Sequence, residues 1–343
     1  MKQPKHIFVI RLSAMGDVAM TVPVLRVLLQ TYPQLKITVV SKAPLKPLFS
    51  GLERCEFMEA DVYGKHKGFG IFKLANQAKA LGIDAVADLH NVIRSKAISN
   101  YLGYRGIKRA TIDKGRAEKK ALIAAKGQQI HQLKSTQQRY ADVFEKLGYP
   151  IDLKDYTAPK PKALEPKHHQ LIGVQPKKFI AIAPFAAYKS KMYPLEMMEE
   201  VIFQLSASRK YQVLLFGGGT SEIEQLEEIA NKYEFVINVS GILSFSEELA
   251  LLSNIDLMVA MDSSNGHLAA MFGIPVITLW GVTHPYAGFK PFGQPNANQL
   301  VSNRERYPLI PTSIYGNKYP PAYENAMESI PTHLVLEKIH QTV

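Results

Sequence analysis

The sequence predicts an α/β protein with two doubly wound parallel sheets, each with helices on both faces. Short apolar runs alternate with segments of helical periodicity in both halves of the chain, as is typical of parallel strands joined by crossover helices. The length of 343 residues suits two domains of ordinary size. A stretch rich in proline and lysine near the middle indicates the boundary between them.

The second half shows this alternation most clearly. Strands are predicted at residues 179–183, 213–216, 235–239, 257–261 and 276–279. Helices are predicted between them at 195–208, 221–232, 246–254 and 266–272. Right-handed crossovers would join these strands into one parallel sheet.

The first half begins in the same way. Strands are predicted at 6–11, 37–40 and 85–89, and helices at 17–31, 92–102 and 129–147. Residues 64–70 read as a flexible basic loop, and 324–343 as a C-terminal helix. Prolines and charges at 158–169 and 176–178 lack apolar periodicity. We therefore expect an N-terminal domain at 1–165, a linker at 166–178 and a C-terminal domain at 179–343, with the option that the last helix packs back on the N-terminal domain.

Composition limits the class of protein. Hydrophobic residues make up 46% and charged residues 21%, which fits a globular protein, and no run approaches the roughly 18 apolar residues of a membrane span. The N-terminus has no signal-peptide pattern. Cys55 is the one cysteine, which excludes an internal disulfide. We expect a cytoplasmic protein and, without heptads or another assembly signal, a monomer.

The positive charge is unevenly distributed. Residues 1–178 hold 31 Lys and Arg against 14 Asp and Glu, whereas residues 179–343 hold 10 against 16. A basic N-terminal half predicts an anionic partner: a phosphorylated lipid, a membrane surface or nucleic acid. The alternative is a solvated surface without a partner.

The most informative motif follows the predicted strand at 257–261. Asp262, Ser263 and Ser264 come directly after this apolar run, and His267 opens a helix of small residues. The serine hydroxyls and the helix N-terminus suit a diphosphate. Asp262 can accept hydrogen bonds from sugar hydroxyls. This motif points to an enzyme that uses a nucleotide sugar.

Loops after the neighbouring strands carry further candidates for donor binding. These are Lys189, Lys191, Gly218, Glu222, Leu243, Thr283 and His284. The lysines, Thr283 and His284 suit phosphate oxygens, Glu222 suits a ribose or base edge, and Leu243 suits an adenine plane. Glycine lets a ligand approach the backbone. Each position also has a purely structural explanation, as a loop lysine, a partner of the helix dipole, a core leucine or a turn.

The N-terminal half contributes a second group of candidates. Asp17 follows the first strand after Gly16 and is either a helix cap or a site carboxylate. His90, Arg94 and Lys96 follow the strand at 85–89 and form a polar cluster at the ligand edge. The sequence has no G-x-G-x-x-G in the first turn, no H-E-x-x-H or Cys/His metal spacing, and no G-x-S-x-G elbow.

These motifs in this order resemble the bacterial heptosyltransferases of glycosyltransferase family nine, which transfer heptose from ADP-heptose to the inner core of lipopolysaccharide. The matching segments are 11–17 with 21–23, 191–194, 218–222, 262–267, 273–275 and 281–283. Tyr193 stands where the family has Trp. The resemblance extends over nearly the whole chain.

The resemblance implies a GT-B fold, in which two Rossmann-like domains face a cleft, and an inverting mechanism with no cofactor and no obligatory metal. It implies that Asp17 is the general base and that Lys191, Ser263, Ser264 and the helix around His267 stabilise the leaving diphosphate. Asp262 would hold the sugar. Glu222 and Leu243 would hold the adenosine.

The resemblance also implies an acceptor. An anionic glycolipid would bind the basic N-terminal domain, with His90, Arg94 and Lys96 as contacts. The same charge suits peripheral contact with the cytoplasmic leaflet of the inner membrane.

Two departures keep alternatives open. Ser264 stands where the family commonly has Gly, and Phe185-Ala-Ala187 replaces a pair of small or hydroxyl residues. A different nucleotide-sugar donor is therefore the first alternative, and a non-catalytic nucleotide-sugar binder the second. A nucleic-acid-binding module at 105–126 would rest on charge alone, so we expect no nucleic-acid partner.

Overall fold

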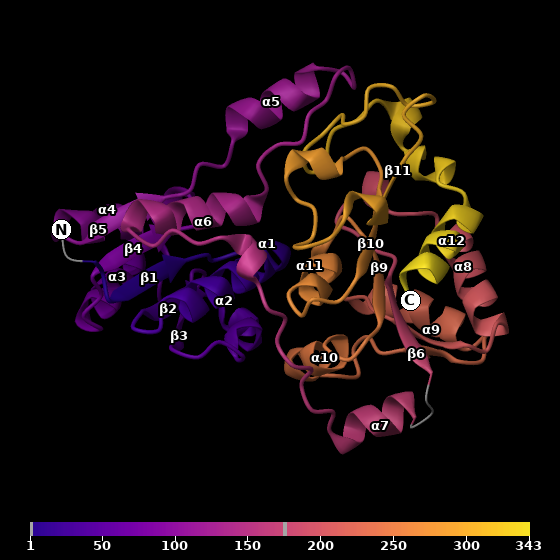
Figure 1. The fold of residues 1–343 in the computed structure, drawn as a ribbon, viewed down its shortest axis with the longest axis horizontal. Helices are drawn as coiled ribbons and strands as arrows, with labels where there is room; N and C mark the ends of the chain where they lie inside the picture. The colour runs from indigo at the N-terminus through magenta and orange to yellow at the C-terminus, as the bar shows by residue number, and fades with distance from the viewer. Residues whose placement is uncertain (1–2, 174–176) are drawn as a thin grey trace. The chain divides into compact units, whose positions relative to one another are not determined.

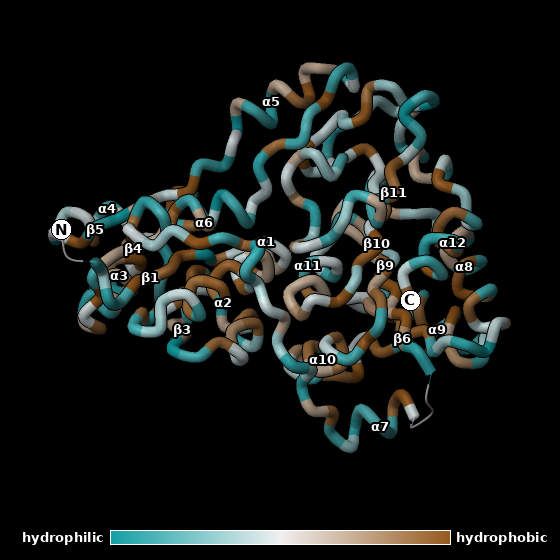
Figure 2. Tube along the Cα trace, in the orientation of Figure 1, coloured by the Kyte–Doolittle hydropathy of each residue, from teal (hydrophilic) through white to brown (hydrophobic). Residues whose placement is uncertain are grey.

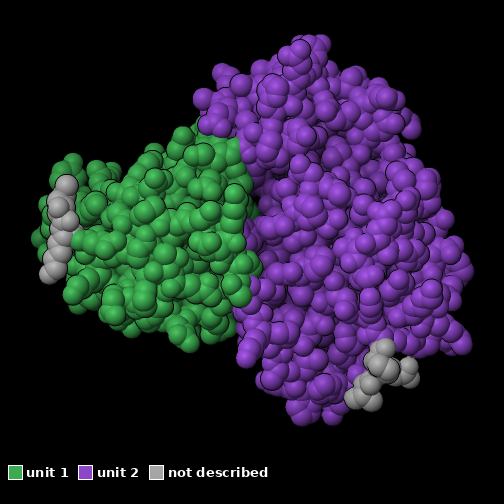
Figure 3. Space-filling model, in the orientation of Figure 1, with its two compact units in different colours: residues 1–116, 134–157 green, residues 117–133, 158–343 purple. Residues whose placement is uncertain are grey.

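The computed structural model describes residues 3–173 and 177–343, which form two compact α/β units (Figure 1). Unit 1 comprises residues 1–116 and 134–157, and unit 2 comprises 117–133 and 158–343 (Figure 3). The units follow the two halves of the chain, except that residues 117–133 belong to unit 2. The domain boundaries at 165 and 178 stay a prediction, and residues 174–176 of the predicted linker lie outside the described residues.

Unit 1 contains a five-stranded parallel sheet in the order β3-β2-β1-β4-β5. Its strands are β1 (His6–Ile10), β2 (Lys36–Ser41), β3 (Cys55–Glu59), β4 (Ala85–Asp88) and β5 (Lys108–Thr111). Ile7 pairs with Ile37 on one side and with Ala85 on the other. Every residue of β1 and β4 is buried, because helices cover both faces of the sheet, and this explains their uninterrupted apolar runs.

The helices of unit 1 form two layers. They are α1 (Met15–Ala19), α2 (Thr21–Thr31), α3 (Ile71–Ala80), α4 (Ile93–Tyr104) and α6 (Thr136–Leu147), with 3₁₀ turns η1 (Ala43–Phe49), η2 (Gly68–Gly70) and η3 (Leu153–Asp155). Helices α3 and α4 pack together and share a core with Phe8 and Ile10 of β1. Helices α2 and α6 contact each other.

Two local predictions for unit 1 need correction. The helix at 17–31 is divided at Met20 into α1 and α2. The helix predicted from residue 129 begins at Thr136, because the Ser135 hydroxyl accepts from the backbone N–H of Gln138 at 3.1 Å and caps it. The flexibility of the loop at 64–70 stays a prediction; the Asp61 carboxylate accepts there from the backbone N–H groups of Gly64 and Lys65 at 2.8 and 2.9 Å.

Unit 2 contains a six-stranded parallel sheet in the order β11-β10-β9-β6-β7-β8. Its strands are β6 (Lys178–Ala183), β7 (Tyr211–Leu215), β8 (Val236–Asn238), β9 (Leu257–Met261), β10 (Val276–Trp280) and β11 (Gln299–Val301). Figure 2 shows the apolar character of the central strands in brown. All five predicted strands of this half are confirmed within two residues, and β11 is an additional edge strand.

The helices of unit 2 are α5 (Arg116–Ala124), α7 (Pro166–Ile172), α8 (Leu195–Ala207), α9 (Thr220–Ala230), α10 (Phe245–Leu252), α11 (Ser264–Ala270) and α12 (Thr332–Thr342). Its 3₁₀ turns are η4 (Lys189–Lys191), η5 (Pro285–Ala287), η6 (Asn296–Asn298), η7 (Pro321–Tyr323) and η8 (Ala326–Ser329). Helix α7 folds inside the predicted linker. Helix α12 packs on α8, because Val335 and Ile339 are fully buried in the core of unit 2. No helix of the described residues has the length and apolarity needed to cross a membrane.

Candidate active site

The strand order places candidate residues at one edge of each sheet. The order reverses between β1 and β4 in unit 1, and between β6 and β9 in unit 2. Ligands of doubly wound sheets bind outside the carboxyl ends of the strands at such a reversal. Segments 11–17 and 88–96 lie there in unit 1, and segments 189–191 and 262–267 lie there in unit 2. Each unit therefore carries candidate residues at its own sheet edge.

Asp17 is held at the carboxyl end of β1 by Arg11. The Arg11 Nη2 and Asp17 Oδ2 atoms are 2.6 Å apart. The same oxygen accepts from the backbone N–H of Ala14, the N-cap residue of α1, at 3.4 Å. The carboxylate thus reaches back to its helix terminus without being the cap residue. Among the described residues nothing engages Oδ1, and the side chain is 30% exposed.

Arg11 itself is fixed from two sides. It is buried, its Nη1 donates to the Leu89 carbonyl at 2.9 Å, and its guanidinium lies 6.0 Å from the ring centroid of Tyr140. The Tyr140 hydroxyl donates to the backbone carbonyl of Asp17 at 3.3 Å. Strand β4 and helix α6 therefore set the orientation of the Arg11–Asp17 pair.

Asp88 and His90 form a buried polar turn after β4. The Asp88 carboxylate accepts from the backbone N–H of His90 and Asn91 and from the Ser95 hydroxyl, at 2.9, 2.8 and 3.1 Å. Burial raises the pKa of Asp88 against these hydrogen bonds. Burial, followed by the charges of Arg11 and Lys114, lowers the pKa of His90 to about 3. His90 is therefore neutral at ordinary pH, and its Nδ1 accepts from the backbone N–H of Leu12 at 3.3 Å.

Lys114 is a member of this group that sequence reasoning missed. Burial lowers its pKa, followed by the charges of Arg11 and Arg116, while Asp17 and Asp88 oppose the shift. Its nearness to both carboxylates follows from β5, which pairs with β4. Only a prediction of β5 could have revealed this position.

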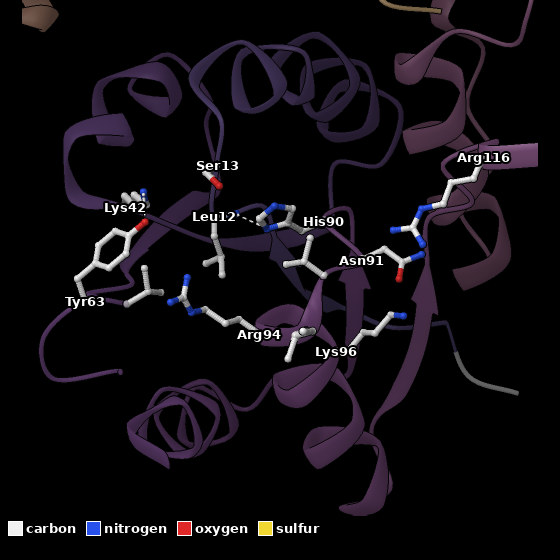
Figure 4. A pocket seen from close by; sticks show the side chains of 12 residues that line it. Leu12, Ser13, Lys42, Tyr63, His90, Asn91, Arg94, Lys96 and Arg116 are labelled. Carbon is white, nitrogen blue, oxygen red and sulfur yellow. Dashed lines mark hydrogen bonds between the residues drawn. The ribbon is translucent and has the colours of Figure 1, made fainter. Parts of the chain in front are cut away.

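A cavity of about 670 Å³ opens in unit 1 beside this turn (Figure 4). Its lining residues are Leu12, Ser13, Lys42, Val62, Tyr63, His90, Asn91, Val92, Ile93, Arg94, Lys96 and Arg116. Four of them are cations and none is an acid. The Tyr63 ring lies under two of the cations, with Lys42 Nζ at 4.8 Å and the Arg94 guanidinium at 5.4 Å from its centroid. The three residues predicted to contact the acceptor thus lie in one basic pocket. Lys42, Tyr63 and Arg116 also line this pocket, and the sequence analysis did not identify them.

In unit 2, three predicted residues meet at one carboxylate oxygen. Lys191 Nζ lies 3.0 Å from Asp262 Oδ2, and the Thr283 hydroxyl donates to the same oxygen at 2.9 Å. The Lys191 and Asp262 side chains are 12% and 11% exposed. Lys191, Asp262 and Thr283 follow β6, β9 and β10, which are neighbours in the sheet.

The start of α11 adds two hydroxyl groups, because Ser263 and Ser264 directly follow Asp262 in the sequence. Ser263 is the N-cap residue, but its side chain makes no capping hydrogen bond. Its Oγ is buried, and no atom of the described part of the chain hydrogen-bonds to it. Ser264 begins the helix, and His267 is buried in it. A buried hydroxyl of this kind is costly without a partner, so it suits a ligand oxygen.

The other donor candidates lie in separate local arrangements. Lys189 is 69% exposed and pairs with Glu324 at 2.9 Å. The Glu222 carboxylate accepts from the backbone N–H of Gly218 at 2.8 Å. Leu243 is buried ahead of α10. The structure separates the two loop lysines, because Lys191 points to Asp262 and Lys189 to an exposed partner.

No group of three or more His, Cys, Asp or Glu residues within 3–173 and 177–343 is arranged to hold a metal ion. The expectation that the reaction needs no metal and no cofactor stays a prediction.

Comparison with known proteins identifies the family. The model of glycosyltransferase family 9 (heptosyltransferase) matches residues 71–313. The lipopolysaccharide core heptosyltransferase OpsX of Haemophilus influenzae is 26% identical over 297 residues, which covers 82% of this chain and 80% of that protein.

Solved structures show the same fold. The crystal structure of a family 9 glycosyl transferase from Veillonella parvula superposes with a TM-score of 0.76 at 19% identity, covering 100% of this chain and 98% of that one. The E. coli heptosyltransferase WaaC with ADP-2-deoxy-2-fluoro heptose gives a TM-score of 0.68 at 19% identity, covering 98% and 100%. The predicted GT-B class is thereby confirmed. Because the family model extends over well more than half of the chain, this protein belongs to glycosyltransferase family 9 (heptosyltransferase) and is a glycosyltransferase.

Proposed function

We propose that the enzyme transfers heptose from ADP-heptose to the inner core of lipopolysaccharide, with inversion at the anomeric carbon. The observation that carries this proposal is the Lys191–Asp262–Thr283 cluster at the strand-order reversal of unit 2. A cation and a carboxylate, both largely shielded from water, suit a ligand that carries both phosphate and sugar hydroxyls. The names of two similar proteins agree: OpsX is a lipopolysaccharide core heptosyltransferase, and WaaC is described with an ADP-heptose analogue.

Unit 2 would bind the donor. Lys191 Nζ forms an ion pair with Asp262 Oδ2 at 3.0 Å. With donor bound, Lys191 would turn to the diphosphate and Asp262 would accept from sugar hydroxyls, while Thr283 keeps the carboxylate in place. The buried Ser263 hydroxyl, with Ser264 and the helix around His267, would donate to phosphate oxygens.

The adenosine would bind elsewhere in the same unit. Glu222, held by the backbone N–H of Gly218, would accept from ribose hydroxyls. Leu243 would flank the adenine. Lys189, which is exposed and paired with Glu324, would add only long-range attraction to the diphosphate.

Unit 1 would bind an anionic glycolipid acceptor in its basic pocket. Arg94 and Lys96 lie there with Lys42 and Arg116, and the pocket has no carboxylate to oppose them. Neutral His90 would contribute hydrogen bonds rather than charge. The lipid part of such an acceptor would bring the enzyme to the cytoplasmic leaflet of the inner membrane.

Asp17 would act as the general base. The acceptor oxygen attacks the anomeric carbon as its proton passes to Oδ1, the oxygen that Arg11 leaves open. The bond from the anomeric carbon to the phosphate oxygen breaks, and its electron pair leaves with ADP. Lys191 and the hydroxyls at the start of α11 stabilise the charge that develops on this leaving group.

Acceptor-dependent ADP release tests the proposal. With ADP-heptose and a deacylated inner-core acceptor, we expect Asp17→Asn to lower the rate by about 10²–10⁴ because the base is lost while the shape is kept. Asp142→Asn is the matched control, since Asp142 is also an ion-paired carboxylate of unit 1, at 2.7 Å from Lys134, and should release ADP at the wild-type rate. Wild-type activity in Asp17→Asn would remove the base assignment, and no release by the wild type would remove the donor or acceptor assignment.

A different nucleotide sugar is the second candidate. Phe185 and Ala186 pack against the hydrophobic core of unit 2, at the place where the family has small or hydroxyl residues, so phosphate contacts there differ from the family pattern. A panel of nucleotide sugars distinguishes the two candidates. A preference for ADP-heptose of tenfold or more excludes the alternative donor. A protein that binds a nucleotide sugar but releases no nucleotide with any acceptor would be non-catalytic.

A further inference from the structure

Four large apolar side chains of unit 1 are unusually exposed. Phe69 and Tyr104 are each 91% exposed, Ile93 is 88% exposed and Tyr63 is 69% exposed. They are the most exposed large hydrophobic side chains of the described chain. Single exposed apolar residues are ordinary, but a contiguous group indicates a binding surface.

These side chains belong to one surface over α3 and α4. The Phe69 ring stacks on Phe72 with centroids 6.5 Å apart, and Phe72 contacts Tyr101 at 5.2 Å. Ile93, Tyr101 and Tyr104 lie at positions i, i+8 and i+11 of α4, which share one helix face. The two helices pack together along their length. We call the face formed by residues 63–83 and 93–109 the α3–α4 surface.

The α3–α4 surface is strongly cationic, with one carboxylate at its edge: Asp61, which accepts from the backbone N–H of Lys65 at 2.9 Å. Its two segments contain no Asp or Glu. Their nine cationic side chains are all exposed: Lys65, Lys67, Lys73, Lys79, Arg94, Lys96, Arg105, Lys108 and Arg109. A face that only needs to be soluble mixes both signs. Exposed aromatic and aliphatic groups among a large excess of cations are typical of a surface that binds an anionic membrane interface.

We propose that the α3–α4 surface docks on an anionic phospholipid bilayer. The cations would meet lipid phosphates, while Phe69, Ile93 and Tyr104 would enter the interface between head groups and acyl chains. The inference rests on the proposed function for the identity of the partner, because a lipid-linked acceptor has to be taken from a membrane.

The position of the acceptor pocket supports this partner. Tyr63, Ile93 and Arg94 belong to the α3–α4 surface and also line the basic pocket (Figure 4). An acceptor head group can therefore pass from the bilayer surface into the pocket while its acyl chains stay in the membrane. A partner that covered this surface without being a membrane would block that route.

Vesicle co-sedimentation without donor or acceptor tests the proposal. The vesicles contain either phosphatidylcholine alone or equal parts of phosphatidylcholine and phosphatidylglycerol. We expect the wild type to bind only the second kind, and more weakly at high salt. Phe69→Ser/Tyr104→Ser and Lys65→Glu/Lys67→Glu should each lose about tenfold or more in partitioning. None of these four residues lines the pocket.

The matched controls lie on unit 2. Phe203 is an exposed aromatic of α8 and Lys210 an exposed lysine that follows it, so Phe203→Ser and Lys210→Glu should bind as the wild type does. Equal binding to both kinds of vesicle, or wild-type binding by the surface variants, would overturn the proposal. A wild-type dimer that Phe69→Ser/Tyr104→Ser converts to a monomer, measured by light scattering, would also overturn it, because a second copy would then cover the surface.

ADP release separates this inference from the proposed function. The surface variants should match the wild type on a deacylated acceptor and fall about tenfold behind it on an acceptor embedded in phosphatidylglycerol vesicles. Loss on the deacylated acceptor would mean that the surface acts in catalysis and not in docking. A wild type that binds vesicles but releases no ADP would contradict the proposed function and leave the docking surface intact.

Discussion

Lys189 and Lys191 are two residues apart, and the sequence could not distinguish their roles. Both follow β6 and both suit a phosphate. The structure separates them through their partners, since Lys191 lies against the shielded carboxylate of Asp262 whereas Lys189 extends to Glu324 with 69% of its side chain exposed. An exposed pair contributes little because water screens it. The shielded lysine is therefore the stronger candidate for the diphosphate.

A matched pair of variants checks this difference. We expect Lys191→Met to lower acceptor-dependent ADP release by about 10²–10³, the usual effect of losing one preorganised charge donor. Lys189→Met should change it less than about threefold. Losses of equal size would show that the ion-pair partners of the two lysines do not predict their roles in donor binding.

The sequence identified candidate residues that directly follow a predicted strand. It missed residues that follow a strand without an apolar pattern. Asp17, His90 and Asp262 each follow a buried apolar run that is visible in the sequence. Lys114 and Arg116 follow β5, in which only Ala110 is buried, so its residues give no strand signal. Tyr63 and Arg116 of the pocket follow β3 and β5, which the sequence did not predict. Lys42 follows the predicted strand β2 and was still missed, because a single lysine after a strand is not a distinctive signal.

At the scale of elements, the same rule separates predicted from missed strands. The central strands β6, β7, β9 and β10 are covered on both faces and read as continuous apolar runs. The edge strands β3, β5 and β11 include polar or exposed residues, so their pattern resembles a loop. The edge strand β8 was predicted, because two of its three residues are buried. A strand can be predicted from its apolar pattern only to the extent that it is buried.

Residues 117–133 form a segment whose helix α5 and whose packing in unit 2 the sequence did not predict. They follow Arg116 of the pocket and pack within unit 2, where the Leu133 backbone N–H donates to the Tyr286 carbonyl at 2.9 Å and Lys119 Nζ lies 4.0 Å from the Phe289 ring centroid. The Arg304 guanidinium donates to the Gly127 carbonyl. These partners lie soon after Thr283 in sequence, so the segment fixes the loop that follows the donor cluster.

Gly127 offers a direct test of this anchor. Its φ is +76°, and a Cβ there would overlap the Pro308 carbonyl. Gly127→Ala should lower the free energy of unfolding by about 2–4 kcal/mol, the sum of left-handed strain and overpacking. It should also speed proteolysis within 117–133. Gly106→Ala is the control, since its φ is +83° with open space around the Cβ, and it should cost only about 1–2 kcal/mol. Equal costs would mean that Gly127 does not anchor the segment.

At the scale of the whole molecule, buried histidines govern how folding stability depends on pH. Burial is the largest cause that lowers the pKa of four of them: His6, His66, His90 and His284. The pKa is about 3 for His90 and about 4 for His284. As the pH falls below about 6.5, these histidines are protonated in the unfolded chain but stay neutral in the folded protein. The folded protein therefore loses stability until the pH reaches the pKa of the histidine in the folded state.

Glu248 acts in the opposite direction. Burial raises its pKa to about 7, so between pH 7 and its unfolded value near 4.5 the folded protein binds the proton first. That carboxyl stabilises the fold as the pH falls, and Asp88 does so in the same sense. The pKa of Asp61, Glu199 and Glu247 is lowered by hydrogen bonds, so the stability that these carboxyls contribute is lost as the pH falls, as it is for the histidines. We therefore expect a net loss of stability below about pH 6.

Thermal unfolding between pH 8 and pH 4.5 measures this balance, and His90→Asn isolates the largest contribution. The Asn side-chain oxygen can replace Nδ1 as the acceptor for the Leu12 backbone N–H, but it does not titrate. Between pH 6.5 and pH 4.5 the wild type should lose about 2–3 kcal/mol through His90 alone, so its unfolding temperature should fall more steeply than that of the variant. Parallel curves would show that His90 is protonated in the folded protein, and an unfolding temperature that rises toward pH 4.5 would show that the buried carboxyls outweigh the histidines.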